Sequence, residues 1–260
     1  MKYRANKRKI IVGNWKMNPL RAKDAEKLFK NVATLVSQVK KTDIVVAVPF
    51  IYLDRLGKIR TSKIKLGAQD SFGVDTGPFT GEISPEMLYD IGARYVILGH
   101  SERRELGEGN ELINKKIKGA LASGLVPILC VGEKSRDENH EYFEIVKTQV
   151  EECLNGISKN SLSKIIIAYE PVWALSSTAN RRDATPTDSE EMVIFIKKTL
   201  ADKFGAKAEL PRIIYGGSAN EKDALDFLMK GGVDGLLPGK ASLSAKKFSK
   251  IIEICEASNN

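Results

Sequence analysis

The sequence predicts an α/β fold, a (βα)8 barrel formed by a single domain over residues 1–260. Two observations support this prediction. Short apolar runs alternate with segments of helical period along the whole chain, which is typical of parallel α/β folds. Eight such pairs fit in 260 residues, close to the usual size of about 250 residues for this barrel. The alternative is a doubly wound sheet, but no Gly-x-Gly-x-x-Gly follows the first apolar run.

The eight predicted strands are rich in Ile and Val and do not alternate with polar residues. This pattern indicates parallel strands that are covered on both faces. They lie at residues 10–12, 44–48, 64–66, 95–98, 126–131, 165–169, 212–215 and 233–237.

The predicted helices carry apolar residues three and four positions apart, with polar residues between them. The clearest of these stripes lie at residues 25–39, 142–154, 192–200 and 248–255. The third helix has an additional start signal, because Thr185, Pro186 and Asp188 read as an N-cap, a proline at the first helical position and an acid three residues on.

Composition excludes several classes of protein. The three cysteines are far apart and odd in number, so they form neither a disulfide framework nor a zinc motif. No apolar run approaches the ~18 residues of a membrane span, and the start of the chain lacks the apolar core of a signal peptide. We therefore expect a soluble, cytoplasmic protein. The 41 Lys and Arg exceed the 33 Asp and Glu by eight, which points to an anionic partner without identifying it.

The residue that follows the sixth predicted strand is a candidate base. Active sites of (βα)8 barrels lie at the carboxyl ends of the strands, where Glu170 is expected. The proline after Glu170 favours an extended backbone, and the neighbours Val172 and Trp173 are apolar. Such surroundings would raise the pKa of the carboxyl and make it a stronger base. The alternative is a surface glutamate beside a loop.

His100, after the fourth predicted strand, is a candidate hydrogen-bond donor to a substrate oxygen. Only one other histidine, His140, occurs, in a polar stretch at the start of a helix. Backbone N–H groups after the strand would favour the neutral imidazole of His100. A purely structural histidine is the alternative.

After the first predicted strand, Asn14 and Lys16 lie two apart on an expected extended segment, so both side chains can point the same way. Lysine offers a cation to an anion, and asparagine offers a neutral donor. The alternative for Lys16 is an ordinary solvated lysine.

A phosphate site is expected after the seventh and eighth strands. Gly216-Gly217-Ser218 and Gly239-Lys240 follow them, and glycines allow the backbone N–H groups to approach an anion closely. Residues 171–184, which we call the lid loop, have no predicted structure of their own and are long enough to cover Glu170 and exclude water.

Together these residues resemble the triosephosphate isomerase family, and the resemblance covers essentially the whole chain. Seven motifs occur in the order that this family has. They are Gly13-Asn14-Trp15-Lys16-Met17-Asn18, Ala68-Gln69, Phe79-Thr80-Gly81-Glu82, Gly99-His100-Ser101-Glu102-Arg103-Arg104, Cys130-Val131-Gly132-Glu133, Tyr169-Glu170-Pro171-Val172-Trp173-Ala174 and Tyr215-Gly216-Gly217-Ser218.

The resemblance implies a TIM barrel and an isomerase of glycolysis and gluconeogenesis that interconverts dihydroxyacetone phosphate and D-glyceraldehyde 3-phosphate. It implies Glu170 as the base and His100 as the group that polarises the carbonyl. Lys16 and Asn14 would stabilise the phosphate and the enediolate, with Glu102 beside Lys16. No metal and no cofactor are implied.

The lid loop departs from the family pattern. The hinge Pro171-Val172-Trp173 is intact, but residues 174–184 are three residues longer than usual and lack both glycines of the family. Ser176 stands where a backbone N–H is expected to bind phosphate, and Ala184 closes the loop.

Two further departures are single residues. The second glycine after the eighth strand is replaced, so that Lys240 follows Gly239 and either adds positive charge or crowds the phosphate. Asp70 follows Gln69 where the family has asparagine.

The segment from Gln69 to Glu82 has the length of the loop that enters the partner subunit in this family. The resemblance therefore implies a homodimer, with Thr80 reaching toward Asn14 of the neighbour. A monomer with the loop folded back is the alternative.

Two other functions remain open at this point. One is a barrel that binds a phosphorylated ligand but turns it over poorly because its lid cannot close. The other is a nucleic-acid platform, which the 7% of aromatic residues and the scattered lysines disfavour. A separate hypothesis is that Arg181 and Arg182 of the lid loop guide a dianionic substrate; solvated side chains are the alternative.

Overall fold

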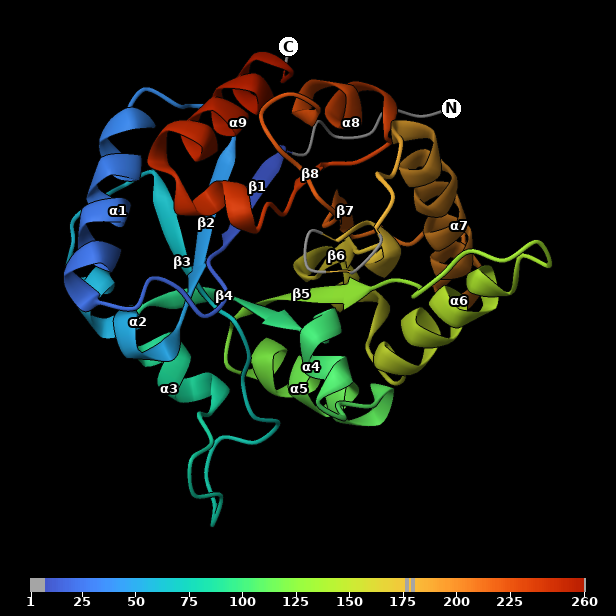
Figure 1. Cartoon of the computed structure of the whole chain (residues 1–260). Helices are drawn as coiled ribbons and strands as arrows, with labels where there is room; N and C mark the ends of the chain where they lie inside the picture. Colours follow the sequence, from blue (N-terminus) through green and yellow to red (C-terminus); the bar gives the residue numbers. More distant parts are fainter. Residues whose placement is uncertain (1–7, 176–177, 179–180, 260) are drawn as a thin grey trace.

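The computed structural model describes residues 8–175, 178 and 181–259, which form one closed barrel of eight parallel strands (Figure 1). Each strand pairs with its neighbours in sequence, and β8 closes the ring on β1. The predicted (βα)8 fold is thus confirmed. The strands are β1 (Ile10–Asn14), β2 (Asp43–Val48), β3 (Ile64–Ala68), β4 (Ala93–Leu98), β5 (Val126–Val131), β6 (Ile166–Tyr169), β7 (Arg212–Tyr215) and β8 (Gly235–Leu236).

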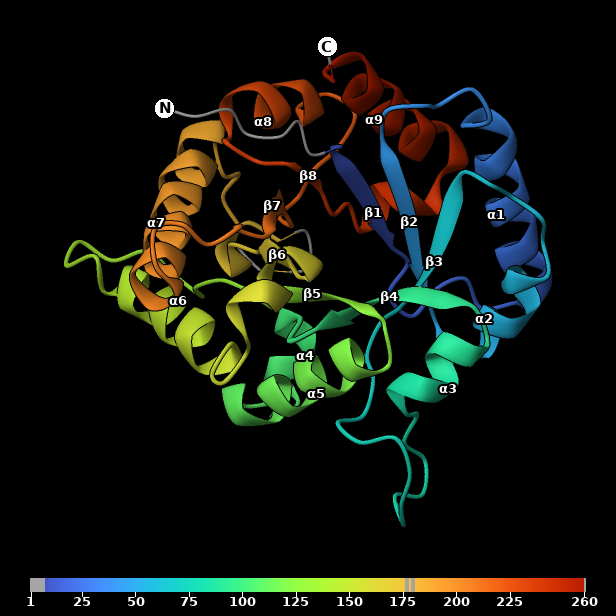
Figure 2. The same ribbon diagram turned by 180° about the vertical axis from the view of Figure 1, so that it is seen from behind.

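Helices surround the barrel on its outside, as the front and back views show (Figures 1 and 2). They are α1 (Ala22–Leu35), α2 (Phe50–Gly57), α3 (Pro85–Asp90), α4 (Ser101–Glu105), α5 (Asn110–Ala122), α6 (Glu141–Cys153), α7 (Pro186–Phe204), α8 (Ala224–Lys230) and α9 (Ala245–Ala257). Short 3-10 turns occur at η1 (Lys159–Lys164), η2 (Val172–Ala174) and η3 (Lys240–Leu243). None of the helices in the described part of the chain has the length and apolar character needed to cross a membrane.

All eight predicted strands exist, with small errors at their ends. β1 continues through Gly13 to Asn14, where a side chain on Gly13 would come within 2.8 Å of the Phe248 ring. The predicted helix at residues 25–39 ends at Leu35, four residues early, although Val36 and Val39 remain buried in the turn that follows. Apolar periodicity thus marked most buried positions, but it failed at Leu35, which is 51% exposed, and it placed the helix end incorrectly.

The core lies in two shells, which explains the continuous apolar runs in the sequence. Ile10 and Val12 point into the barrel, whereas Ile11 between them packs against the helices. Because most strand positions are buried, on both faces of the sheet, few of them can be polar, and the exposed exceptions are Lys65 of β3 and Arg94 of β4. Burying an Ile or Val side chain fully stabilises the fold by roughly 1.5–3 kcal/mol.

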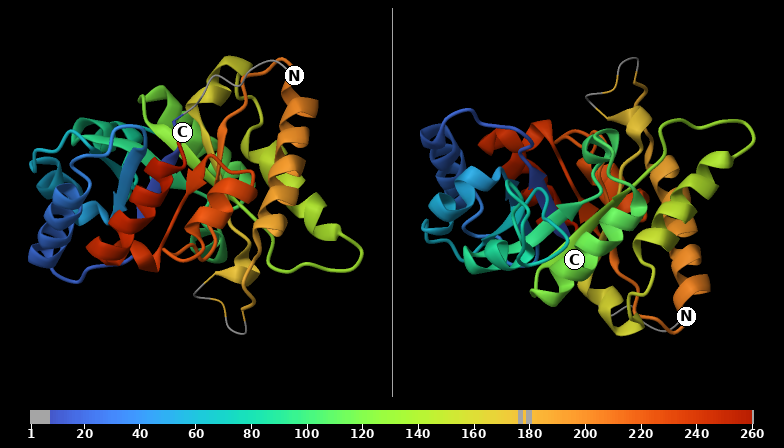
Figure 3. Two further views of the ribbon diagram at one scale, coloured as in Figure 1. Left: turned by 90° about the horizontal axis from the view of Figure 1, so that it is seen from above. Right: turned by 90° about the horizontal axis from the view of Figure 1, so that it is seen from below.

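Two loops stand away from this body. Residues 70–82 between β3 and α3 project from the barrel at the bottom of Figure 1. The gold η2 turn of the lid loop stands out beyond the end of the barrel in the views of Figure 3.

Candidate active site

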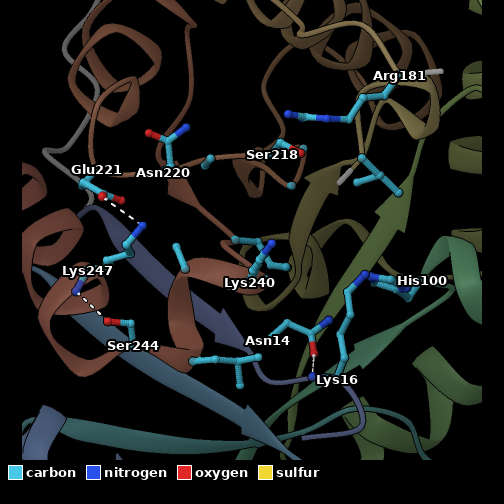
Figure 4. Close-up of a pocket in the computed structure, with 18 residues that line it drawn as sticks. Asn14, Lys16, His100, Arg181, Ser218, Asn220, Glu221, Lys240, Ser244 and Lys247 are labelled. Atoms are coloured by element: carbon cyan, nitrogen blue, oxygen red, sulfur yellow. Dashed lines mark hydrogen bonds and ion pairs between the residues drawn. The ribbon is translucent and has the colours of Figure 1, made fainter. Parts of the chain in front are cut away.

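A cavity of about 680 Å³ opens at the carboxyl end of the barrel (Figure 4). Residues from loops after β1, β4, β6, β7 and β8 line it, as expected if strand ends in a closed barrel converge on one site. Among the predicted site residues, those that line this cavity are Asn14, Lys16, His100, Gly216, Gly217, Ser218, Gly239 and Lys240.

Glu170 lies next to the cavity and is 2% exposed. Its Oε1 atom is 3.5 Å from His100 Nε2, and its Oε2 accepts a hydrogen bond from the backbone N–H of Ser101 at 3.4 Å. Oε1 has no hydrogen-bond partner among the described residues. The side chain also borders a second cavity of about 200 Å³ with Ser101 and Cys130. Glu170 is therefore a buried carboxylate with one oxygen uncommitted.

Two glycines make room for Glu170. A Cβ on Gly132 would lie 1.9 Å from the Glu170 carbonyl oxygen, and a Cβ on Gly216 would lie 2.6 Å from its Cγ. Burial and the charge of Glu170 raise the pKa of the Cys130 thiol, so that this neighbour stays protonated and uncharged.

His100 is the N-cap residue of α4, and its ring is held by the backbone. The N–H of Glu102 donates to His100 Nδ1 at 3.2 Å. An acceptor at Nδ1 places the proton of the neutral imidazole on Nε2, which lies on the side of Glu170. This geometry supports the neutral imidazole expected from the sequence.

The prediction of an extended backbone at Lys16 is wrong. Lys16 has φ +51, in the left-handed region. Two hydrogen bonds hold this turn: the N–H of Lys16 donates to Asn14 Oδ1 at 2.9 Å, and the amide of Gln69 donates to the Lys16 carbonyl at 2.8 Å. Both Asn14 and Lys16 still line the cavity. Because the Oδ1 of Asn14 is engaged, its amide nitrogen is left to donate to a ligand.

Lys16 and Glu102 form an ion pair, with Nζ 2.5 Å from Oε1. The resemblance placed Glu102 at this position. Glu102 is about half exposed, and its other oxygen is 3.7 Å from His100 Nδ1. The ion pair orients the lysine and offsets part of its positive charge.

Glu133, which belongs to one of the seven family motifs, has a structural role that the sequence did not predict. It is fully buried, and its Oε1 accepts hydrogen bonds from the Tyr169 hydroxyl and from Trp173 Nε1, both at 2.8 Å. Arg136 pairs with the same oxygen at 3.3 Å. Glu133 therefore ties the hinge of the lid loop to β6, directly beside Glu170.

The described part of the lid loop contains a turn that the sequence did not predict. Val172–Ala174 form the η2 turn, and the hydroxyl of Thr178 donates to the Val172 carbonyl at 2.5 Å. Predicted hinge residues Pro171 and Trp173 are buried. Ser176, the predicted phosphate contact, lies outside the described residues.

The side chains of Arg181 and Arg182 lie in different surroundings. Arg181 lines the large cavity, whereas the guanidinium of Arg182 lies over the Trp173 ring, 4.3 Å from its centroid. The sequence hypothesis treated the two arginines as one pair, and the structure separates them.

The lid loop ends at the predicted cap of α7, just after Ala184. The hydroxyl of Thr185 accepts from the Asp188 N–H, and the Asp188 carboxylate accepts from the Thr185 N–H at 2.8 Å. Burial raises the pKa of Asp188, but these bonds and the charge of Arg136 outweigh it and leave the pKa below its ordinary value. The cap fixes the second hinge of the lid.

Replacing Asp188 with alanine is expected to lower the free energy of unfolding by about 1 kcal/mol at pH 7, in the middle of the range for helix caps. The melting temperature should fall by about 2–4 °C. Since the folded pKa of Asp188 is lowered, its contribution is complete well above pH 4 and is lost as the pH falls through that folded pKa. Thermal melts from pH 7 to pH 3 test this.

Asp202→Ala in the same helix is the matched control, because Asp202 is 67% exposed and makes only an i,i+4 pair with Lys198. Its effect should stay within about 0.5 kcal/mol. A loss for Asp188→Ala that stays constant over the whole pH range would contradict the role of its charge.

A charge cluster at the base of the projecting loop contains three buried residues, Asp70, Glu108 and Lys116, and the partly exposed Arg103. Lys116 Nζ lies 2.8 Å from Asp70 and 2.6 Å from Glu108, and Arg103 pairs with both carboxylates. Asp70 and Glu108 together thus balance buried Lys116 and the partly exposed Arg103, which gives the carboxylate at position 70 a structural role that the sequence did not reveal. Thr80 and Glu82, farther along the loop, are exposed.

A family model described as triosephosphate isomerase matches residues 9–255. A triosephosphate isomerase of Caldanaerobacter subterraneus subsp. tengcongensis is 43% identical, covering 95% of this chain and 99% of the relative. One from a Thermoanaerobacter species is 44% identical, with the same coverage. A solved triosephosphate isomerase structure from Bartonella henselae is 34% identical, with a TM-score of 0.82 over 95% of this chain and 98% of that one.

Proposed function

The chain belongs to the triosephosphate isomerase family, and we propose that it interconverts dihydroxyacetone phosphate and D-glyceraldehyde 3-phosphate with Glu170 as the base. The observation that carries this assignment of the base is the uncommitted Oε1 of buried Glu170, 3.5 Å from His100 Nε2 and beside the cavity. The family assignment favours turnover over the alternative of a barrel that only binds a phosphorylated ligand.

Glu170 takes a proton from C1 of dihydroxyacetone phosphate, and the electron pair of that C–H bond passes into an enediolate. The same carboxyl then returns a proton to C2, which yields the aldehyde. His100 donates from Nε2 to the substrate oxygen and moves a proton between the two oxygens. No redox change occurs, and all atoms stay in the substrate and the two side chains. Each positioned acid or base contributes roughly 10²- to 10⁴-fold to the rate.

Lys16 and Asn14 stabilise the negative charge that the reaction develops. The ammonium of Lys16 and the amide nitrogen of Asn14 both reach the cavity, and Glu102 keeps Lys16 in place through the ion pair. A fixed donor of this kind is worth roughly 3–4 kcal/mol when charge appears on a buried oxygen.

The phosphate occupies the part of the cavity near Ser218, Gly239 and Lys240. A Cβ on Gly239 would touch Lys16 Cε at 3.5 Å, so this backbone lies beside the catalytic lysine. Lys240 begins the η3 turn with an exposed side chain, which supports added positive charge more than crowding of the ligand. Ser176 is a further candidate through its backbone N–H.

Coupled steady-state assays in both directions test the isomerase assignment. The purified protein should convert each triose phosphate into the other without added metal or cofactor. Binding of inorganic phosphate without turnover in either direction would instead favour the binding-protein alternative.

The protein is also proposed to act as a homodimer through the segment from Gln69 to Glu82. This segment projects from the barrel and bears Val74 and Phe79, which are 46% and 44% exposed. Met17, next to the catalytic lysine, is 86% exposed. Apolar side chains gathered around one projecting loop are typical of an interface. In the dimer, Thr80 would approach Asn14 of the other subunit.

Sedimentation at micromolar concentration should give twice the chain mass of 28.7 kDa. Val74→Asp should shift the protein toward the monomer, because a charge in an apolar interface is costly. Met229→Asp on α8 is the control, since Met229 is 63% exposed but lies on another part of the barrel. A monomeric wild type would refute the dimer.

A cytoplasmic location is the last part of this proposal. Cys130, Cys153 and Cys255 are all buried and free, which suits a reducing compartment. Cell fractionation tests it.

A further inference from the structure

We propose that Arg181 of the lid loop is a substrate-binding residue that recruits and holds the phosphate dianion. The inference rests on the proposed function, because the ligand is the phosphate of the triose substrate. In this proposal the Arg181 guanidinium contacts the phosphate from the lid side, opposite the barrel loops that carry Lys16 and Lys240.

The first support is the position of the side chain. Arg181 lines the same 680 Å³ cavity as Lys16, Ser218 and Lys240. In Figure 4 its side chain extends from the lid loop toward Ser218. The Ser218 hydroxyl oxygen is buried and has no hydrogen-bond partner among the described residues. A guanidinium and an unpaired hydroxyl therefore face one space, and both can donate to an anion.

The second support is the charge balance of the cavity. Lys16 is paired with Glu102 at 2.5 Å, so its charge is already partly offset. A phosphate dianion carries about two negative charges near pH 7 and needs further cations. Lys247 also lines the cavity, but it pairs with Glu221 at 3.4 Å. Lys240 supplies a further cation from the barrel side, and Arg181 supplies another from the lid side.

The third support is that Arg181 keeps most of its donors. Within the described part of the chain, Arg181 forms one ion pair, with Asp183 at 2.9 Å from Nη1, and Asp183 is 82% exposed. An exposed pair of this kind contributes little. A guanidinium has five N–H donors in a planar fork that matches two phosphate oxygens, so the remaining donors can bind the ligand.

The neighbouring Arg182 explains how the lid presents Arg181. The Arg182 guanidinium stacks on Trp173, which is 8% exposed and is held by Glu133. This contact joins the two ends of the lid loop and anchors the chain next to Arg181. Arg182 is then a positioning residue, and Arg181 is the one that meets the ligand.

The experiment compares Arg181→Met with the wild type on two substrates, D-glyceraldehyde 3-phosphate and phosphate-free D-glyceraldehyde. We expect kcat/KM for the phosphorylated substrate to fall about tenfold at low salt, and the inhibition constant of inorganic phosphate to rise about tenfold. The value of kcat/KM for D-glyceraldehyde should change less than about twofold. Arg181→Lys should recover part of the loss, because it restores the charge without the fork.

Two control variants distinguish phosphate binding by Arg181 from a general loss of positive charge and from a loosened lid. Lys198→Met on α7 removes the same charge far from the cavity at a 73% exposed site and should leave all three quantities unchanged. Arg182→Met should reduce turnover of both substrates by the same factor, as expected for a loosened lid.

An equal loss on both substrates for Arg181→Met would assign Arg181 a structural role in the lid and overturn the proposal. Unchanged values on both would show a solvated side chain and overturn it as well. If the wild type turned over no triose phosphate, the proposed function would fail, and calorimetric titration of wild type and Arg181→Met with inorganic phosphate would still decide the role of Arg181.

Discussion

Replacing Glu170 with glutamine is expected to lower kcat in both directions by roughly 10³- to 10⁴-fold, at the upper end of the range for a positioned base. Glutamine has nearly the same shape and retains a carbonyl oxygen that can accept from the Ser101 N–H. It cannot take a proton from carbon. The loss should therefore appear in kcat, while the inhibition constant of inorganic phosphate stays within about twofold.

The same variant should fold normally. Glu170 is a buried carboxylate whose Oε1 has no hydrogen-bond partner among the described residues, so removal of its charge is not expected to lower the melting temperature. Glu111→Gln on α5 is the control, because Glu111 is 85% exposed and outside the site. Retention of more than a tenth of kcat by Glu170→Gln would show that another group is the base.

Replacing Lys16 with methionine is expected to lower kcat/KM for D-glyceraldehyde 3-phosphate by about 10³-fold, since a fixed donor to developing charge is worth roughly 3–4 kcal/mol. Part of the loss has a second cause. Without the ammonium, Glu102 faces the cavity as an unpaired carboxylate and repels the anionic substrate. KM should therefore rise and kcat should fall, whereas Glu170→Gln should lower kcat alone.

A double-mutant cycle separates the two causes. Lys16→Met combined with Glu102→Gln should recover roughly tenfold of the lost kcat/KM, because the repulsion is removed while the missing donor is not replaced. Steady-state kinetics of the two single variants and the double variant supply the coupling. If the double variant is as slow as the product of the two single losses, the ion pair does not orient Lys16.

The sequence was informative about the barrel because nearly all strand positions are buried, on both faces of the sheet. Runs such as residues 126–131 have no polar position, and only a few folds bury strands in this way. The same rule located Asn14, His100 and Glu170, since closure of the barrel brings all strand ends together. Local signals sufficed there because the geometry of the fold supplied the rest.

Features that depend on contacts between distant segments could not be read from the chain. The left-handed turn at Lys16 is held by Gln69, 53 residues later. The hydrogen bonds of Glu133 come from Tyr169 and Trp173 on the next strand and its loop. The residues next to Lys16 and Glu133 in the sequence give no sign of these partners. The contacts could therefore not be predicted from the sequence pattern.

The environment of Trp173 turns the lid hinge into an optical reporter. The protein has only two tryptophans, and Trp15 is fully buried beneath the barrel helices. Trp173 instead lies under the Arg182 guanidinium and donates its indole N–H to Glu133. Both contacts alter the electronic surroundings of the ring, and both depend on the arrangement of the hinge. A change in intrinsic fluorescence when ligand is added can therefore be read as rearrangement at Trp173, without a label or an introduced residue.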